Sequence, residues 1–192
     1  STGKHAKKSR VGSVKNDRSW RGEKVMLRLE SFNDFEWRRL VERLDKAVAA
    51  AARDYLRHLH VNRVPIRADD WNEELDELRL AREPDYDRPG LPLVYALKYM
   101  PRRVISILGS LLAVDLDRYP TTVLDVGSGP GATALALDLI NAPRHVNLLG
   151  IEPSPEMIAF ADSSRFTSRV TTRYQAGSLA DGTLGRLPLE AV

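Results

Sequence analysis

Three glycines at alternate positions offer a place where a ligand can lie against the main chain. They are Gly127, Gly129 and Gly131, and they follow the apolar run 122–126, in which Asp125 is the only acid. Glycine has no Cβ atom, so such a turn can adopt positive φ angles and leave its backbone open to close approach. A helix-forming run follows at once, and a helix N-terminus favours polar oxygens nearby. The pattern predicts a ligand-binding turn between a strand and a helix.

A second acidic residue, Glu152, is suited to bind the hydroxyl groups of a ribose. Glu152 ends another apolar run, 21 residues beyond Gly131. A carboxylate in that position can accept hydrogen bonds from both hydroxyls of a ribose diol. Pro153 offers an apolar face to an adenine, and Ser178 and Leu179, which follow a third strand-like run, are expected at the adenine edge.

These residues need an alternating order of strands and helices to bring them together. We expect strands over 123–126, 146–151 and 170–175, and helices over 132–141 and 155–166, the second capped by Ser154. The first strand is too apolar to alternate, which predicts a parallel strand covered on both faces. The predicted class is α/β, with the first βαβαβ half of a Rossmann-like, doubly wound parallel sheet.

A helical region is expected before the first strand. Apolar residues at steps of three and four predict a helix over 33–60, with Asn33 or Asp34 as its cap. A second helix is expected over 69–83, a loop over 86–92, and one long helix or two short ones over 93–112, broken near Pro101. The chain thus divides into a basic tail (1–24) that we expect to be disordered, a helical region (25–118) and the α/β half-domain (119–192).

Residues 123–131 resemble the first motif of class I S-adenosylmethionine-dependent methyltransferases, with the acid two residues before the first glycine. Glu152 and the loop after it resemble the acidic loop that follows the second strand of that family. The resemblance covers about residues 119–180. It implies S-adenosylmethionine as cofactor and methyl transfer to an acceptor, which could be RNA, a ribosomal component or a small molecule. It names no catalytic residue.

The resemblance also assigns roles to the predicted site. Asp125 would reach the ammonium group of the cofactor, directly or through water, and Glu152 would bind its ribose. The turn, with Ser128 between the first two glycines, would lie against the ligand, and Pro153, Ser178 and Leu179 would contact the adenine. Many members carry an acid after the third strand, where this chain has Ala176-Gly177-Ser178. The amino group of the adenine would then need Ser178 or a backbone carbonyl as its partner.

Other interpretations stay open. The spacing Gly127-x-Gly129-x-x-Ala132, with Glu152 about 20 residues further on, also fits the dinucleotide fingerprint of an NAD-dependent oxidoreductase. Asp125 argues against it, because a pyrophosphate would be repelled there. Only 61 residues follow Gly131, too few for the complete sheet of the family. We therefore also consider a fragment, a sheet completed by a partner chain in a split enzyme, and a non-catalytic scaffold.

A weaker resemblance lies upstream. The run 95–103 is similar to the lead-in helix of methyltransferase-like proteins associated with the mitochondrial ribosomal small subunit. The metal-binding cysteines of that family are not present in this chain. The alternative is an ordinary amphipathic helix with a proline kink.

Composition narrows the class of protein. The formal net charge is +3, yet residues 1–24 carry eight Lys or Arg against two acids and so hold +6. Such a tail either contacts nucleic acid such as RNA or is a solvated terminus.

The chain has no cysteine, which excludes disulfides and thiolate metal sites within it, and no metal site is predicted. No apolar run reaches the roughly 18 residues of a membrane span, so we expect no membrane contact and a cytoplasmic protein.

Overall fold

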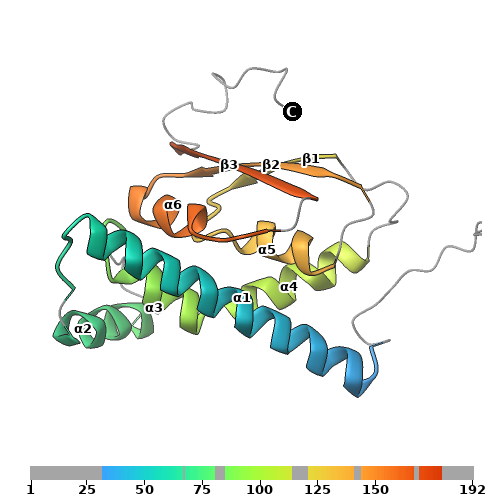
Figure 1. Ribbon diagram of the computed structural model, residues 1–192, viewed down its shortest axis with the longest axis horizontal. Coiled ribbons are helices and arrows are strands. Elements are labelled where there is room, and N and C mark those ends of the chain that lie inside the picture. The colour runs from blue at the N-terminus through green and yellow to red at the C-terminus, as the bar shows by residue number, and fades with distance from the viewer. Residues whose placement is uncertain are drawn as a thin grey trace, which may run out of the picture.

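The computed structural model describes residues 32–66, 68–80, 85–113, 121–140, 144–166 and 169–178. The predicted disordered tail and Leu179 lie outside these ranges. The described elements are α1 (Asp34–Val61), α2 (Ala68–Arg79), α3 (Leu91–Lys98), α4 (Met100–Leu112), β1 (Thr122–Val126), α5 (Ala132–Leu139), β2 (Val146–Glu152), α6 (Pro155–Asp162) and β3 (Val170–Ala176). Their order is the helical run followed by βαβαβ that the sequence predicts (Figure 1).

Helix α1 begins where the sequence predicts, because its first turn satisfies its own free N–H groups. The side chain of Asn33 accepts from the backbone N–H groups of Phe35 and Glu36, and the Glu36 carboxylate accepts from the N–H of Asn33 at 2.9 Å. This reciprocal capping box stabilises a helix start. The helix then runs for 28 residues.

The boundaries of the shorter helices differ from the prediction. Helix α3 begins at Leu91, so Pro92 lies in its first turn and not in a loop. In the first turn of a helix the missing N–H of a proline costs no hydrogen bond. Helix α4 begins anew at Met100, because Pro101 cannot donate the N–H that a continuous helix needs. Helix α6 ends at Asp162, four residues earlier than expected, although Ser154 caps it as predicted and accepts from the N–H of Met157.

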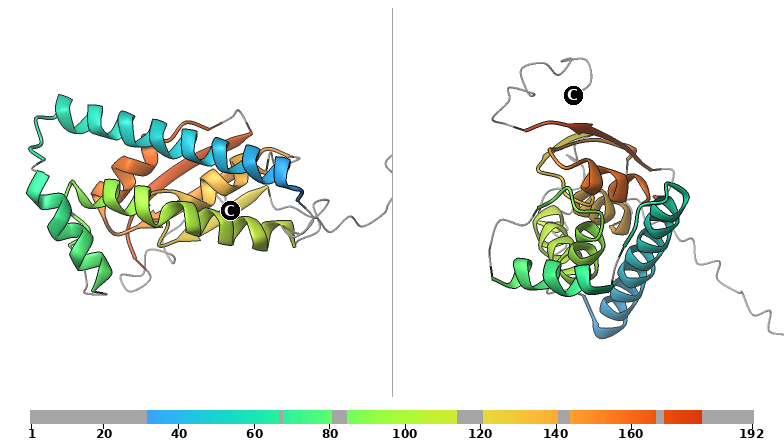
Figure 2. Two further views of the ribbon diagram at one scale, coloured as in Figure 1. Left: turned by 90° about the horizontal axis from the view of Figure 1, so that it is seen from below. Right: turned by 90° about the vertical axis from the view of Figure 1, so that its left-hand side faces the viewer.

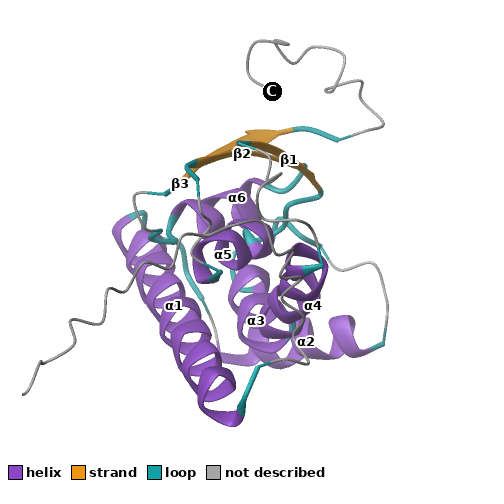
Figure 3. Cartoon of the chain, turned by 90° about the vertical axis from the view of Figure 1, so that its right-hand side faces the viewer, coloured by secondary structure: helices purple, strands orange, loops and turns teal. Residues whose placement is uncertain are grey.

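The three strands form one parallel sheet in the order β1-β2-β3. The register places Asp125 opposite Gly150, and Gly150 opposite Tyr174. The sheet forms one layer, α5 and α6 lie directly against it, and α1, α3 and α4 form a further layer (Figures 1 and 3). All helices of the described ranges lie on the same side of the sheet.

The expectation that β1 is covered on both faces is wrong for the described part of the chain. Leu124 and Val126 are 38% and 39% exposed. Val123 packs with the cluster on the helix side, and successive side chains of a strand point to opposite faces, so Asp125 points to the helix side as well. Leu124 and Val126 therefore point to the face that carries no described helix.

One hydrophobic core joins the helical region to the α/β part. Buried residues of α1, α3 and α4 pack in a single cluster with residues of α5 and α6, including Leu44, Tyr55, Met100, Leu135 and Phe160. Helix α1 runs alongside α3 and α4 on the far side of α5 and α6 from the sheet (Figure 2). The helical region thus supports the helices whose N-termini meet the predicted site.

Candidate functional site

The glycine-rich turn has the backbone conformation that its sequence predicts. Gly127, Gly129 and Gly131 have φ angles of +71°, +52° and +89°, all in the left-handed region. A Cβ atom placed on Gly127 or Gly129 would meet no atom of the described residues within 4 Å. Their conformation, rather than crowding, is what favours glycine at these two positions. The space beside them is open to a ligand that lies on the main chain.

Glu152 lies beside this turn and holds it. Its Oε2 atom accepts a hydrogen bond from the backbone N–H of Gly129 at 2.8 Å, and its Oε1 atom accepts from the N–H of Ser154 at 3.2 Å. Only 6% of the residue is exposed. Two predicted site residues, 23 positions apart, are therefore in direct contact. The bracing of the turn by this carboxylate is a role that sequence reasoning missed.

Asp125 lies opposite Gly150 in the sheet, on the helix-facing side, and is half-buried. Burial raises the pKa of its carboxyl, and a hydrogen bond with the Thr133 side chain partly opposes that rise. The carboxylate is therefore held in a position that costs free energy at neutral pH. A partly buried carboxyl with a raised pKa next to an open turn is typical of functional sites, and it also occurs in structural ones.

Tyr174 is a part of this site that sequence reasoning did not identify. Its ring lies over Gly150, where an added Cβ would be 2.7 Å from Cε1, and its hydroxyl would be 2.7 Å from a Cβ on Gly131. The side chain thus crosses from β3 over β2 to the underside of the turn. The signal in the sequence is Gly150 itself, since glycine inside a strand marks a close approach.

Two buried polar atoms stand unpartnered in this region. The hydroxyl oxygens of Ser128 and Tyr174 have no hydrogen-bond partner among the described residues. Burial and the negative charges of Asp125 and Asp162 raise the pKa of Tyr174 far above its ordinary value, so its phenol keeps its proton. Each hydroxyl is a free donor that a water or a ligand can satisfy.

The loop before α3 closes against the N-terminus of α6. Ser154 donates from Oγ to the carbonyl oxygen of Tyr86 at 2.6 Å. The Tyr55 hydroxyl donates to Oε2 of Glu156 at 2.6 Å and lies 3.0 Å from the carbonyl oxygen of Pro89. These contacts tie α1 and the loop to the residues that directly follow Glu152. No sequence motif pointed to them.

The remaining predicted residues lie at the same edge of the sheet. Pro153 is exposed directly after β2, and Ser178 follows β3, where Gly177 donates to the carbonyl oxygen of Glu152 at 3.1 Å. Leu179 lies outside the described residues. Within the described ranges, no group of acids and histidines is arranged to bind a metal ion. None of the described helices is long and apolar enough to cross a membrane.

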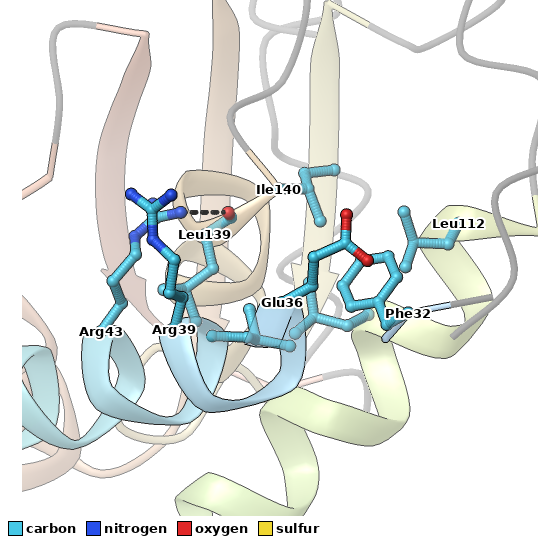
Figure 4. Close-up of a pocket in the computed structure, with 9 residues that line it drawn as sticks. Phe32, Glu36, Arg39, Arg43, Leu112, Leu139 and Ile140 are labelled. Atoms are coloured by element: carbon cyan, nitrogen blue, oxygen red, sulfur yellow. Dashed lines mark hydrogen bonds between the residues drawn. The ribbon is translucent and has the colours of Figure 1, made fainter. Parts of the chain in front are cut away.

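A groove of about 320 Å³ lies elsewhere, at the C-terminal end of α5 (Figure 4). It is lined by Phe32, Leu112 and Ile140 among others, and Arg43 donates to the carbonyl oxygen of Leu139 at 3.0 Å. This end of α5 is opposite to the glycine-rich turn. We therefore keep the candidate site at the glycine-rich turn, where the polar groups suited to a ligand lie. We interpret Arg43 as a cap on the free carbonyls of α5.

Comparison with known proteins does not assign the chain to a family. The chain matches no protein-family model, and no curated protein is similar to it in sequence. The interpretation of the site therefore depends on its geometry.

Proposed function

We propose that this chain binds S-adenosylmethionine at the turn 127–131 and serves methyl transfer, with the described sheet as half of a doubly wound fold. The observation that carries the proposal is the contact of Glu152 with the N–H of Gly129. It joins the acid at the end of β2 to an open, left-handed glycine turn after β1. An adenosyl ligand needs both features within reach of one another.

The residues present suit the parts of this cofactor. The open space beside Gly127 and Gly129 offers a surface for the ligand, and Glu152 keeps lone pairs beyond the two that it uses. Asp125 would pair with the ammonium group, and Pro153 and Ser178 would border the adenine. When bound, the cofactor supplies an electrophilic methyl group. The protein would contribute by orienting that group toward an acceptor.

A dinucleotide suits the site less well. Asp125 lies two residues before the turn, so its negative charge would repel a pyrophosphate bound there and would attract an ammonium group. The acceptor, a contact of the basic tail with RNA, and a cytoplasmic location belong to the proposal as expectations from the sequence.

A non-catalytic scaffold with this fold is the second candidate. The observation that favours it is the engagement of both carboxylate oxygens of Glu152 by backbone N–H groups in a residue that is 6% exposed. A residue whose only task is to brace the turn would show the same contacts.

Calorimetric titration separates the two candidates. We expect the protein to bind S-adenosylmethionine and not NAD. Gly129→Ala should weaken binding at least about tenfold, because its methyl group enters the ligand space while it meets no atom of the described residues within 4 Å. The left-handed φ costs it only about 1–2 kcal/mol of stability. Glu42→Gln, which removes an exposed acid from α1, is the control and should bind as the parent does. A folded parent protein that binds neither ligand would refute the proposal and support a scaffold.

A further inference from the structure

A second surface, on α3 and α4, combines aromatic rings with cations. A pocket of about 450 Å³ is lined by Tyr95, Tyr99, Arg102, Arg103 and Ser106. Tyr95 lies on α3, Tyr99 joins α3 to α4, and the other three lie on α4; the two helices follow each other along one side of the molecule (Figure 2). None of them belongs to the site at the glycine-rich turn. Among the described residues, no carboxylate lines this pocket.

The rings form a pair at the wall of the pocket. The centroids of Tyr95 and Tyr99 are 5.6 Å apart, with an angle of 38° between the planes. Both side chains are only half-buried, and neither hydroxyl has a hydrogen-bond partner in the described part of the chain. The adjacent buried stripe, formed by Ala96, Met100 and Val104, already supplies the core contacts of these helices. The tyrosines therefore present ring surface that the core does not use.

The charges around the rings are of one sign. Arg102 and Arg103 are exposed, and their guanidinium groups form no ion pair with any residue of the described ranges. Lys98 places its ammonium group 5.4 Å from the centre of the Tyr99 ring. Two arginines thus line the pocket beside the tyrosine pair, and a lysine lies over one of its rings. Guanidinium groups bind phosphates with two parallel hydrogen bonds and also stack on flat rings.

We propose that this pocket binds single-stranded nucleic acid. Bases would stack on the tyrosine pair, and the two arginines would hold the phosphates on either side. Stacking on aromatic side chains beside a cationic groove is how proteins hold single strands without reading their sequence. An acidic peptide would use the arginines but would leave the two rings unused. The proposal rests on this surface alone and does not depend on methyl transfer.

The test is fluorescence anisotropy with the full chain and labelled oligonucleotides of one length, uridine for RNA and thymidine for DNA. Tyr95→Leu/Tyr99→Leu should weaken binding roughly tenfold or more without changing its salt dependence, because stacking carries no charge. Arg102→Gln/Arg103→Gln should reduce the slope of log affinity against log salt by roughly 1.4, because each phosphate of a single strand that is no longer neutralised accounts for about 0.7. The difference between uridine and thymidine strands identifies which nucleic acid is preferred.

The matched control is Arg38→Gln/Arg53→Gln, which removes two exposed charges from α1. It should keep both the affinity and most of the slope, and the basic tail is common to all variants. Circular dichroism confirms that each variant is folded. The proposal is overturned if the control loses as much slope as the pocket variant, if the tyrosine variant binds as the parent does, or if a glutamate-rich peptide displaces the strand. Because S-adenosylmethionine titration reads another surface, failure here leaves the proposed function untouched.

Discussion

A side chain at position 150 is predicted to destabilise the fold, because the ring of Tyr174 occupies the place that it would take. In Gly150→Ala the new Cβ would lie 2.7 Å from Cε1 of Tyr174 and 2.8 Å from Oγ of Ser128. Ordinary contacts at such a position begin at about 3.4 Å. The ring cannot retreat easily, because its hydroxyl already lies against Gly131. Overpacking of this kind costs about 1–3 kcal/mol of stability, and we expect the upper half of that range.

The same substitution should cost little when the ring is removed. In a Tyr174→Val background the clash with the ring disappears and only the contact with Oγ of Ser128 remains. The advantage of alanine over glycine inside a strand, about 0.5–1 kcal/mol, opposes the cost of that contact. Urea unfolding of the parent, both single variants and the double variant gives the coupling energy. We expect about 2–3 kcal/mol of coupling between the two positions. Additive effects, within about 0.5 kcal/mol, would show that the ring does not lie over Gly150 and would refute the reasoning.

Two further predictions concern buried polar groups near the site. Tyr55→Phe should lower the free energy of unfolding by about 1–3 kcal/mol, because the Glu156 carboxylate then loses the hydroxyl that donates to it. The matched Tyr174→Phe removes a hydroxyl without a described partner and should cost less than about 1 kcal/mol in the same urea experiment. Equal losses would contradict the hydrogen bond from Tyr55 to Glu156. Burial raises the pKa of Asp125, so the folded state holds its proton to higher pH than the unfolded chain and stability falls as pH rises through that window. Asp125→Asn should therefore raise the Tm at neutral pH, and the gain should vanish as pH falls below the ordinary aspartate pKa. A gain that does not depend on pH would refute the role of the charge.

Local signals predicted most of the elements. The capping box at Asn33, the cap at Ser154 and the glycines with positive φ are each fixed within a few residues, so the sequence displays them directly. The alternation of strands and helices follows for the same reason. Helix ends were harder to predict, because the first turn at Leu91 and the early end of α6 depend on packing against other elements.

Contacts that cross strands could not be predicted in the same way. Tyr174 reaches the turn only because the register puts it opposite Gly150, and that register is set by the whole sheet. The exposure of Leu124 and Val126 depends on which elements cover each face, and an apolar run carries no information about that. The bracing contact of Glu152 is of the same kind. Its acidity indicates polar partners, but one of its two partners is a backbone group 23 residues away.

This bracing contact decides which variants can test function. Because a protein side chain, Glu152, holds the backbone of Gly129, less ordering of the turn remains for a cofactor to cause. Removal of the carboxylate would loosen the turn and delete a ribose contact at once, so weaker binding in Glu152→Ala would fit both a cofactor site and a brace. Gly129→Ala separates them, since it keeps the carboxylate and adds one methyl group to space that the described residues leave empty. A protein that stays folded and no longer binds S-adenosylmethionine after that change has its ligand against this turn.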